Sequence, residues 1–172
     1  ESAELVAIAE RENLRLMVGH LLLYHPAVEW IKRKLTEGEF GDIFYIYSTR
    51  VNLGHVRSDE NALWSLAPHD ISVILHLLDA DPEVVTARGE CFLQPGIEDV
   101  VFMSMHFPGK RMSHCQVSWL DPHKVRKITV VGSRKMVTFD DMEPAEKLRI
   151  YDKGAVRDYD SYGDWWITLR SG

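Results

Sequence analysis

Two consecutive hairpin signals in the second half of the sequence restrict the fold more than any other feature. One centres on Pro108 and Gly109 and the other on Gly132, each between two segments rich in apolar and β-branched residues. Gly and Pro at such positions are typical of tight turns. Strands joined by short turns pair in antiparallel fashion. The predicted strands span 43–51, 84–92, 99–107, 111–119, 125–131, 136–139 and 148–151.

Helical periodicity is confined to the first half. We predict a short helix at Leu5 to Ala9 ended by Asn13, a helix opened by Pro26, and a third helix that begins near Pro68. The stripe of the third helix consists of Ile71, Ile74, Leu75 and Leu78. A short strand is expected over 14–18. Because so few helices cannot cover both sides of so many strands, we predict an α+β fold. It is a predominantly antiparallel open sheet with helices packed on one face, a two-layer sandwich.

Composition excludes several classes of protein. The net charge is −6 and the basic residues are scattered, which argues against a nucleic-acid partner. No segment approaches the ~20 apolar residues of a membrane span. Cys91 and Cys115 lie in apolar segments without a framework spacing, so we expect buried free thiols and a cytoplasmic protein. His and Cys spacing predicts no metal site.

His69 is the candidate catalytic residue. The third helix is expected to begin just before it, and the positive end of a helix dipole disfavours an imidazolium. A neutral imidazole accepts a proton from a hydroxyl, as alcohol oxidation requires. The alternative is a structural histidine that satisfies nearby backbone groups.

Two polar segments supply candidate substrate contacts. The first is the loop 52–61, and the second follows the hairpin strand that ends at Trp119. The candidate substrate-binding residues are Asn52, Arg57, Asn61, Trp119, Lys124 and Arg126. A cationic rim edged by an aromatic ring suits a sugar or an anionic substituent. In the alternative, Trp119 lies in the core and the basic side chains extend along the surface. Asp140 and Asp141 are expected to be solvated turn residues.

The order of three segments resembles the glucose–fructose oxidoreductase/inositol dehydrogenase (Gfo/Idh/MocA) superfamily. Residues 3–20 resemble the last helix and strand of its nucleotide-binding domain. Residues 25–43, from His25-Pro26-Ala27-Val28 to Gly41-Asp42-Ile43, resemble its bridge into the substrate domain. Residues 63–72 resemble the helix with the catalytic histidine. Residues 118–133, with Asp140 and Asp141, are similar to a subgroup that uses nucleotide sugars or related sugars.

The resemblance implies two parts. Residues 1–20 would be a remnant of the dinucleotide-binding domain, and 21–172 a substrate-binding and oligomerisation domain cut at its C-terminus. It also implies hydride transfer between NAD or NADP and a sugar, nucleotide sugar or cyclitol, with His69 as general base. His20 and Tyr24 are the candidate cofactor contacts. The Gly-rich cofactor loop and the Glu-Lys-Pro lysine would precede Glu1, so this chain alone is expected to be inactive.

One departure from the family pattern keeps an alternative open. Ser65 stands where the family has an Asp four residues before the histidine, and the substitute acid could be Asp59, Glu60 or Asp70. The alternative is a non-catalytic binding or scaffolding protein with the same fold. In either case we expect a small-molecule sugar-type partner and a homo-oligomer formed through the open sheet face, without nucleic acid or membrane.

Overall fold

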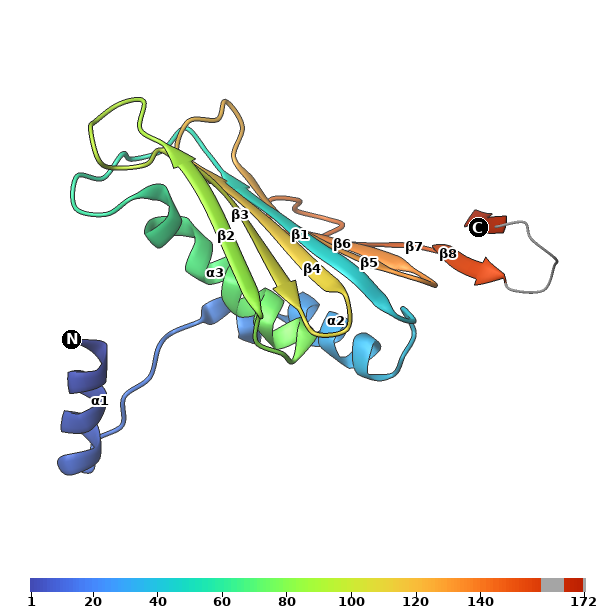
Figure 1. Cartoon of the computed structure of the whole chain (residues 1–172), viewed down its shortest axis with the longest axis horizontal. Helices are drawn as coiled ribbons and strands as arrows, with labels where there is room; N and C mark the ends of the chain where they lie inside the picture. Colours follow the sequence, from blue (N-terminus) through green and yellow to red (C-terminus); the bar gives the residue numbers. More distant parts are fainter. Residues whose placement is uncertain (159–165, 172) are drawn as a thin grey trace.

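The computed structural model describes residues 1–158 and 166–171 (Figure 1). Four helical segments alternate with or precede nine strands. The helices are α1 (Ser2–Arg11), the 3-10 helix η1 (Leu21–Tyr24), α2 (Pro26–Thr36) and α3 (Ala62–Leu78). The strands are β1 (Ile43–Val51), β2 (Val84–Glu90), β3 (Val100–Phe107), β4 (Arg111–Ser118), β5 (Val125–Gly132), β6 (Met136–Asp140), β7 (Leu148–Tyr151), β8 (Lys153–Asp158) and β9 (Trp166–Ser171).

Seven strands form one mixed sheet in the order β2-β3-β4-β1-β5-β6-β7, and β8 and β9 form a separate pair. All neighbouring strands of the large sheet are antiparallel except β1 and β4, which are parallel. The predicted α+β fold with a mainly antiparallel sheet is therefore confirmed. The parallel pair was not predicted, because no hairpin specifies where β1 enters the sheet.

Both hairpins form where the glycines predicted them. Gly109 and Lys110 adopt positive φ angles of 77° and 61° in the β3–β4 turn, a conformation that glycine adopts without steric cost. In the β5–β6 turn, Gly132 packs against the carbonyl of Phe40, and a Cβ there would collide with it. This glycine is therefore required for the approach of the chain that leads into β1.

Helices α2 and α3 pack against the sheet on the same side (Figure 1). Val28 and Ile31 of α2 and Val73 and Ile74 of α3 are buried in one core cluster with sheet residues such as Val130. A second cluster lies at the start of α3 and consists of Ala62, Ala67, Val101, Val117 and Trp119. The two clusters fix α3 across the inner face of the sheet, the face that the helices cover.

Helix α3 begins earlier than the sequence predicted. Asn61 is its N-cap, with the side-chain oxygen accepting a hydrogen bond from the Trp64 amide at 3.1 Å, and Pro68 lies inside the helix. The prediction near Pro68 was wrong because Pro was taken for the first residue, where its missing N–H has no effect. In the predicted stripe Ile74 and Leu78 are buried but Ile71 and Leu75 only partly, and Val73, which the predicted stripe does not include, is buried.

The N-terminal segment and one cysteine also differ from expectation. Asn13 ends the first helix with a φ of 50°, as predicted, but residues 14–18 form no strand and their side chains are exposed. These residues have no neighbouring strand with which to form hydrogen bonds, and a single extended segment is not stable as a β-strand. Cys115 is buried as expected, whereas Cys91 is exposed. No described helix is both long and apolar enough to cross a membrane.

Candidate functional site

A buried ion pair lies between the middle of α3 and β1. Asp70 follows His69 on α3, and its carboxylate accepts hydrogen bonds from Arg50 Nε at 3.1 Å to both oxygens and from Arg50 Nη2 at 2.8 Å. The two side chains are only 2% and 9% exposed. Burial raises the pKa of the Asp70 carboxyl, and the Arg50 guanidinium opposes that rise. A bidentate pair of this kind is rigid and fixes the helix against the strand.

His69 lies on the solvent side of this ion pair and stays exposed. Partial burial lowers the pKa of its imidazole, the charge of Arg50 lowers it further, and Asp70 opposes them. The charges of Arg126 and His20 add smaller lowering effects on the same pKa. A pKa below the ordinary value leaves the imidazole neutral at pH 7, able to accept a proton. We predicted that a helix N-terminus would keep His69 neutral. This is not the cause of the lowered pKa, because α3 begins well before His69, at Ala62.

Ser65 lies one helical turn before His69, so no carboxylate occupies the position where the family resemblance implies one. Of the three acids considered as substitutes, Asp59 is exposed and Glu60 pairs with Arg57 at 3.0 Å. Asp70 is the one whose charge acts on the imidazole. Its carboxylate is already engaged by Arg50, so it influences His69 as half of an ion pair.

The structure brings one predicted substrate residue to His69. Arg126 lies directly opposite Arg50 in the β1–β5 register, and directly opposite residues of paired strands share a face. Arg126 therefore lies on the inner face, on the same side of the sheet as α3. Asn52 and Lys124 lie at the same end of these two strands, with Lys124 exposed and Asn52 half-buried.

Three other predicted substrate residues make contacts within the chain. Asn61 caps α3 and donates to Glu98 at 2.7 Å, so its amide holds two structural hydrogen bonds. Trp119 is 2% exposed in the second core cluster, which favours the core alternative over a sugar-binding rim. Arg57 forms an exposed ion pair with Glu60.

The candidate cofactor contacts lie at the start of η1. His20 is half-buried and near enough to His69 to affect the pKa of its imidazole, while Tyr24 is 68% exposed. The preceding Leu16, Met17 and Val18 are exposed as well. Residues 16–18 therefore form an uncovered apolar segment that leads into η1.

Arg50 was missed in the sequence. The alternation of the predicted strand 43–51 places Ile46, Ser48 and Arg50 on its inward side. A charged side chain at a buried strand position needs a partner of opposite charge. That requirement points to an acid on the covering helix. Asp70 was considered only as a possible partner of His69, so its pairing with β1 was overlooked.

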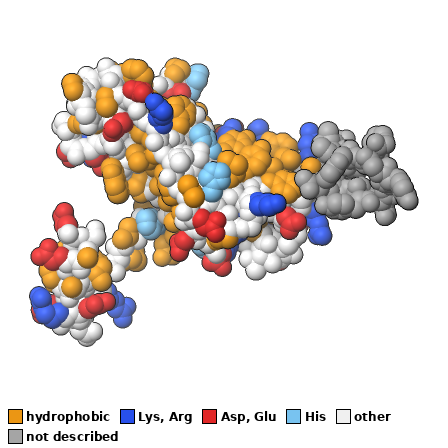
Figure 2. Space-filling view, in the orientation of Figure 1, with side chains coloured by type: hydrophobic (Ala, Val, Ile, Leu, Met, Phe, Trp, Pro, Cys, Tyr) orange, Lys and Arg blue, Asp and Glu red, His pale blue; other side chains and the backbone are white. Residues whose placement is uncertain are grey.

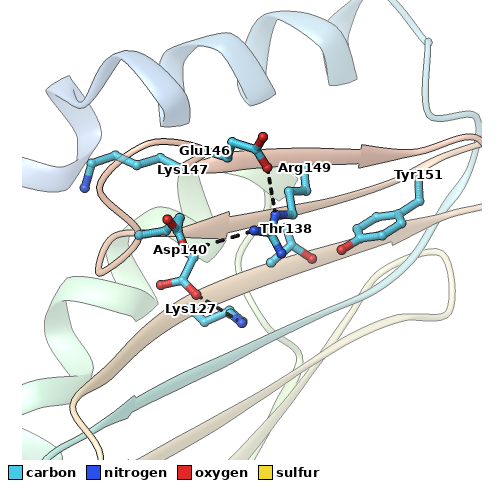
Figure 3. Close-up of a pocket in the computed structure, with 8 residues that line it drawn as sticks. Lys127, Thr138, Asp140, Glu146, Lys147, Arg149 and Tyr151 are labelled. Atoms are coloured by element: carbon cyan, nitrogen blue, oxygen red, sulfur yellow. Dashed lines mark ion pairs between the residues drawn. The ribbon is translucent and has the colours of Figure 1, made fainter.

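A charged pocket lies away from His69, over the last strands of the large sheet (Figure 3). Its lining contains Lys127 and Asp140, paired at 3.0 Å, and Arg149, paired with Glu146 at 3.5 Å and with Glu143 at 4.0 Å. These pairs satisfy one another at the surface, which leaves little net charge for a ligand. Among the described residues no three His, Cys, Asp or Glu side chains converge as metal ligands.

Curated relatives resemble this chain over part of their length. A 2,7-anhydro-N-acetylneuraminate hydratase from Escherichia coli K12 is 22% identical in a 166-residue alignment that covers 87% of this chain and 44% of the relative. A UDP-N-acetylglucosamine 3-dehydrogenase from Acidithiobacillus ferrooxidans is 30% identical over 90 residues, which is 52% of this chain and 28% of the relative. The chain thus spans less than half the length of both.

A solved structure supports the fold. The inositol dehydrogenase homologue from Azotobacter vinelandii, complexed with NADH and myo-inositol, matches with a TM-score of 0.74 at 17% identity, over 95% of this chain and 47% of that chain. Residues 28–138 match the family described as GFO/IDH/MocA C-terminal domain. That range includes α3, the ion pair between Arg50 and Asp70, and Arg126. The chain belongs to the Gfo/Idh/MocA family of oxidoreductases and contains its C-terminal domain.

Proposed function

We propose that the full-length protein transfers a hydride between NAD or NADP and a carbon that bears a hydroxyl in a sugar, nucleotide sugar or cyclitol, with His69 as general base. One observation carries the proposal. His69 is exposed, it precedes Asp70 of the buried ion pair, and burial together with the charge of Arg50 lowers the pKa of its imidazole. Those are the properties that a proton acceptor needs for alcohol oxidation.

Two of the three relatives reported above support this reaction class, and the third is a hydratase by name. The names of two matched proteins include a nucleotide-sugar dehydrogenase and an inositol dehydrogenase homologue bound to NADH. Their substrates are hydroxylated small molecules, as the proposal requires for this chain. Fold alone does not establish chemistry, so the assignment rests on His69 and its surroundings.

In the proposed reaction His69 accepts the proton of the substrate hydroxyl while the carbon loses hydride. Bound nicotinamide supplies the acceptor for that hydride. The imidazolium that forms lies near the charges of Arg50 and Arg126, which lower the pKa of the ring. The proton is therefore released readily to solvent after each turnover. In the reverse direction the same ring donates the proton.

The residues at the start of η1 fit a cofactor beside His69. The charge of His20 acts on the imidazole of His69, and Tyr24 has a ring that is largely exposed. His20 and Tyr24 would hold the nicotinamide ring, which would accept the hydride while His69 takes the hydroxyl proton. The exposed Leu16, Met17 and Val18 would then be covered by the domain that binds the rest of the dinucleotide.

The test uses the full-length protein with NAD or NADP and a panel of sugars, nucleotide sugars and cyclitols, with formation of the reduced cofactor as readout. We expect His69→Asn to lower kcat by about 10²–10⁴-fold, the range for loss of a positioned acid–base group. Lys110→Asn, in the exposed turn between β3 and β4 where Asn also tolerates the positive φ, is the control and should leave kcat unchanged. Equal turnover by His69→Asn and the control would reject His69 as the base.

A non-catalytic binding protein is the second candidate, and Ser65 is the observation that favours it. Without a carboxylate one turn away, an imidazolium at His69 is less stabilised. In that case the full-length protein would bind a sugar or dinucleotide but reduce no cofactor with any member of the panel. Binding without turnover would therefore select this candidate.

We also propose a homo-oligomer formed through the outer face of the sheet, opposite α2 and α3. Tyr45, Tyr47, Phe102 and Met112 are each 40–46% exposed there. Tyr45 and Tyr47 stack at 6.1 Å between ring centroids, and Figure 2 shows hydrophobic side chains gathered over the strands. Large exposed apolar patches mark interaction sites. A cytoplasmic location, where an exposed free thiol such as Cys91 stays reduced, belongs to the same proposal.

A further inference from the structure

His114 lies near the middle of the outer face of the sheet. Its strand, β4, is third in the order of seven, and the register places His114 opposite Ser104 of β3 and Tyr47 of β1. The residues on either side of it, Ser113 and Cys115, are buried on the inner face. Because successive side chains of a strand point to opposite faces, the imidazole of His114 points outward.

Aromatic and hydroxyl groups contact or flank this imidazole. Its ring stacks on Phe102, with 6.2 Å between the centroids and 20° between the planes. Its Nδ1 lies 3.4 Å from Ser104 Oγ. On the other side, Tyr47 lies opposite His114 and stacks with Tyr45. The half-buried imidazole is thus part of the aromatic surface through which we propose that the chain self-associates.

Uncharged side chains surround His114 on this face. The surrounding positions in the register are Phe102, Ser104 and His106 of β3, Met112 and Gln116 of β4, and Tyr45, Tyr47 and Thr49 of β1. The titratable groups among them are His106, Tyr45 and Tyr47, and none of the surrounding residues is an Asp or Glu. An imidazolium at His114 would therefore have no carboxylate beside it in the described part of the face.

The charged side chains of the outer face lie at least one strand further away. Arg88 and Glu90 are on the edge strand β2, and Lys127 of β5 pairs with Asp140 of β6 at 3.0 Å. An uncharged aromatic centre with charged residues towards its margins is the usual composition of a protein–protein interface.

The size of the outer face suits a second copy of this chain. Seven strands about 4.8 Å apart, each roughly seven residues long, cover on the order of 600 Å² in projection, and protruding side chains increase the accessible area. A stable interface takes about 800 Å² from each partner. A second copy presents the same uncharged centre, so two such faces can meet without opposing like charges.

We propose that His114 makes the association of two copies through this face dependent on pH, so that the dimer forms near pH 7.5 and dissociates near pH 5.5. This inference rests on the self-association proposed above and names the group that regulates it. In the contact the imidazole would lose water without gaining a carboxylate, and burial penalises its charged form far more than its neutral form. Histidine changes its charge between pH 5 and 8.

The sign of the effect follows from proton linkage. The separated chains can bind a proton at His114, whereas the dimer excludes it, so association is strongest at high pH and weakens as the pH falls. Each excluded proton costs about tenfold in affinity between pH 7.5 and 5.5 for a histidine with an ordinary titration. Since each dimer contains two copies, the dissociation constant should rise by about 100-fold.

Sedimentation equilibrium of the 172-residue chain over a range of concentrations, at pH 7.5 and pH 5.5, measures this dissociation constant. Circular dichroism at both pH values verifies that the chain stays folded. A change in the dissociation constant below about threefold would overturn the role of His114 but leave the self-association standing. A strict monomer at both pH values would instead reject the contact through the outer face, and this inference with it.

His114→Phe keeps a ring to stack on Phe102 but cannot take up a proton, so it should associate equally at both pH values. His114→Gln is a second variant without a titratable group, in case the phenyl ring packs differently, and should also lose the pH dependence. His123→Gln, in the exposed loop after β4, is the matched control and should keep the 100-fold dependence within about threefold. The same pH dependence in all three variants would overturn the proposal.

Discussion

Asp70 and His69 are neighbours in the sequence but their side chains have opposite surroundings. Successive residues of a helix point about 100° apart, so Asp70 is turned into the sheet while His69 remains at the surface. On burial the Asp70 carboxylate exchanges its hydrogen bonds with water for hydrogen bonds from Arg50. Such a pair contributes little net stability compared with apolar residues, but removing one partner leaves an uncompensated charge.

Asp70→Asn is therefore expected to lower the free energy of unfolding by about 3 kcal/mol, because Arg50 would stay buried without its counterion. Urea denaturation followed by circular dichroism measures the change. Glu60→Gln removes an exposed ion-pair partner and is the control, with an expected loss below about 0.5 kcal/mol.

The double variant Arg50→Met with Asp70→Leu separates charge from packing. It should recover most of the stability lost in Asp70→Asn, since apolar residues can replace a buried ion pair without net loss. If Asp70→Asn were as stable as Glu60→Gln, the buried Arg50 would not depend on Asp70 as its counterion.

At the scale of elements, α3 carries the residues that set the chemistry of the site. Ser65 and His69 lie one turn apart, at the spacing where side chains on a helix are neighbours. A carboxylate at the position of Ser65 would favour the charged imidazole. The serine therefore keeps the proton affinity of His69 lower than an aspartate there would.

Ser65→Asp should raise the pKa of the His69 imidazole, because a negative charge one turn away stabilises its protonated form. The shift of the imidazole signal in an NMR pH titration measures it directly, and His69→Gln assigns the signal. Ser58→Asp, in the exposed loop before α3, adds the same charge elsewhere and should leave the titration unchanged. Identical titration curves for Ser65→Asp and the unmodified chain would contradict the proximity of these two positions.

Elements with local signals could be predicted, and those that depend on distant partners could not. The hairpin strands follow from Gly109 and Gly132, and Leu148–Tyr151 was predicted with its observed bounds. The start of α3 was missed because Pro68 is a stronger visible signal than the cap at Asn61. The neighbourhood of His69 and Arg126 was beyond prediction, since it depends on the register of β1 with β5.

At the scale of the whole molecule, the outer face of the sheet remains uncovered by any described helix. We expect the chain to self-associate through it, because Tyr45, Tyr47, Phe102 and Met112 expose apolar surface together. Tyr47→Asp should shift the equilibrium towards monomer, by placing a charge in the centre of the contact. Light scattering at two protein concentrations measures the mass.

Leu53→Asp is the control for this experiment, since Leu53 is 76% exposed but lies in the loop after β1, outside the sheet face. It should associate as the unmodified chain does. If the unmodified chain were a strict monomer at the higher concentration, the proposed contact through this face would not hold for the chain.

The position of β1 in the sheet also has a consequence for how the chain folds. Ile46 lies between Ser113 of β4 and Val130 of β5, both far along the sequence. During synthesis β1 leaves the ribosome long before either neighbour, whereas each hairpin brings its own two strands within a few residues. Non-local pairing is slow because long loops must close first. We expect the hairpins to form early and β1 to dock last, so that Arg50 and Asp70 meet only in the final step of folding.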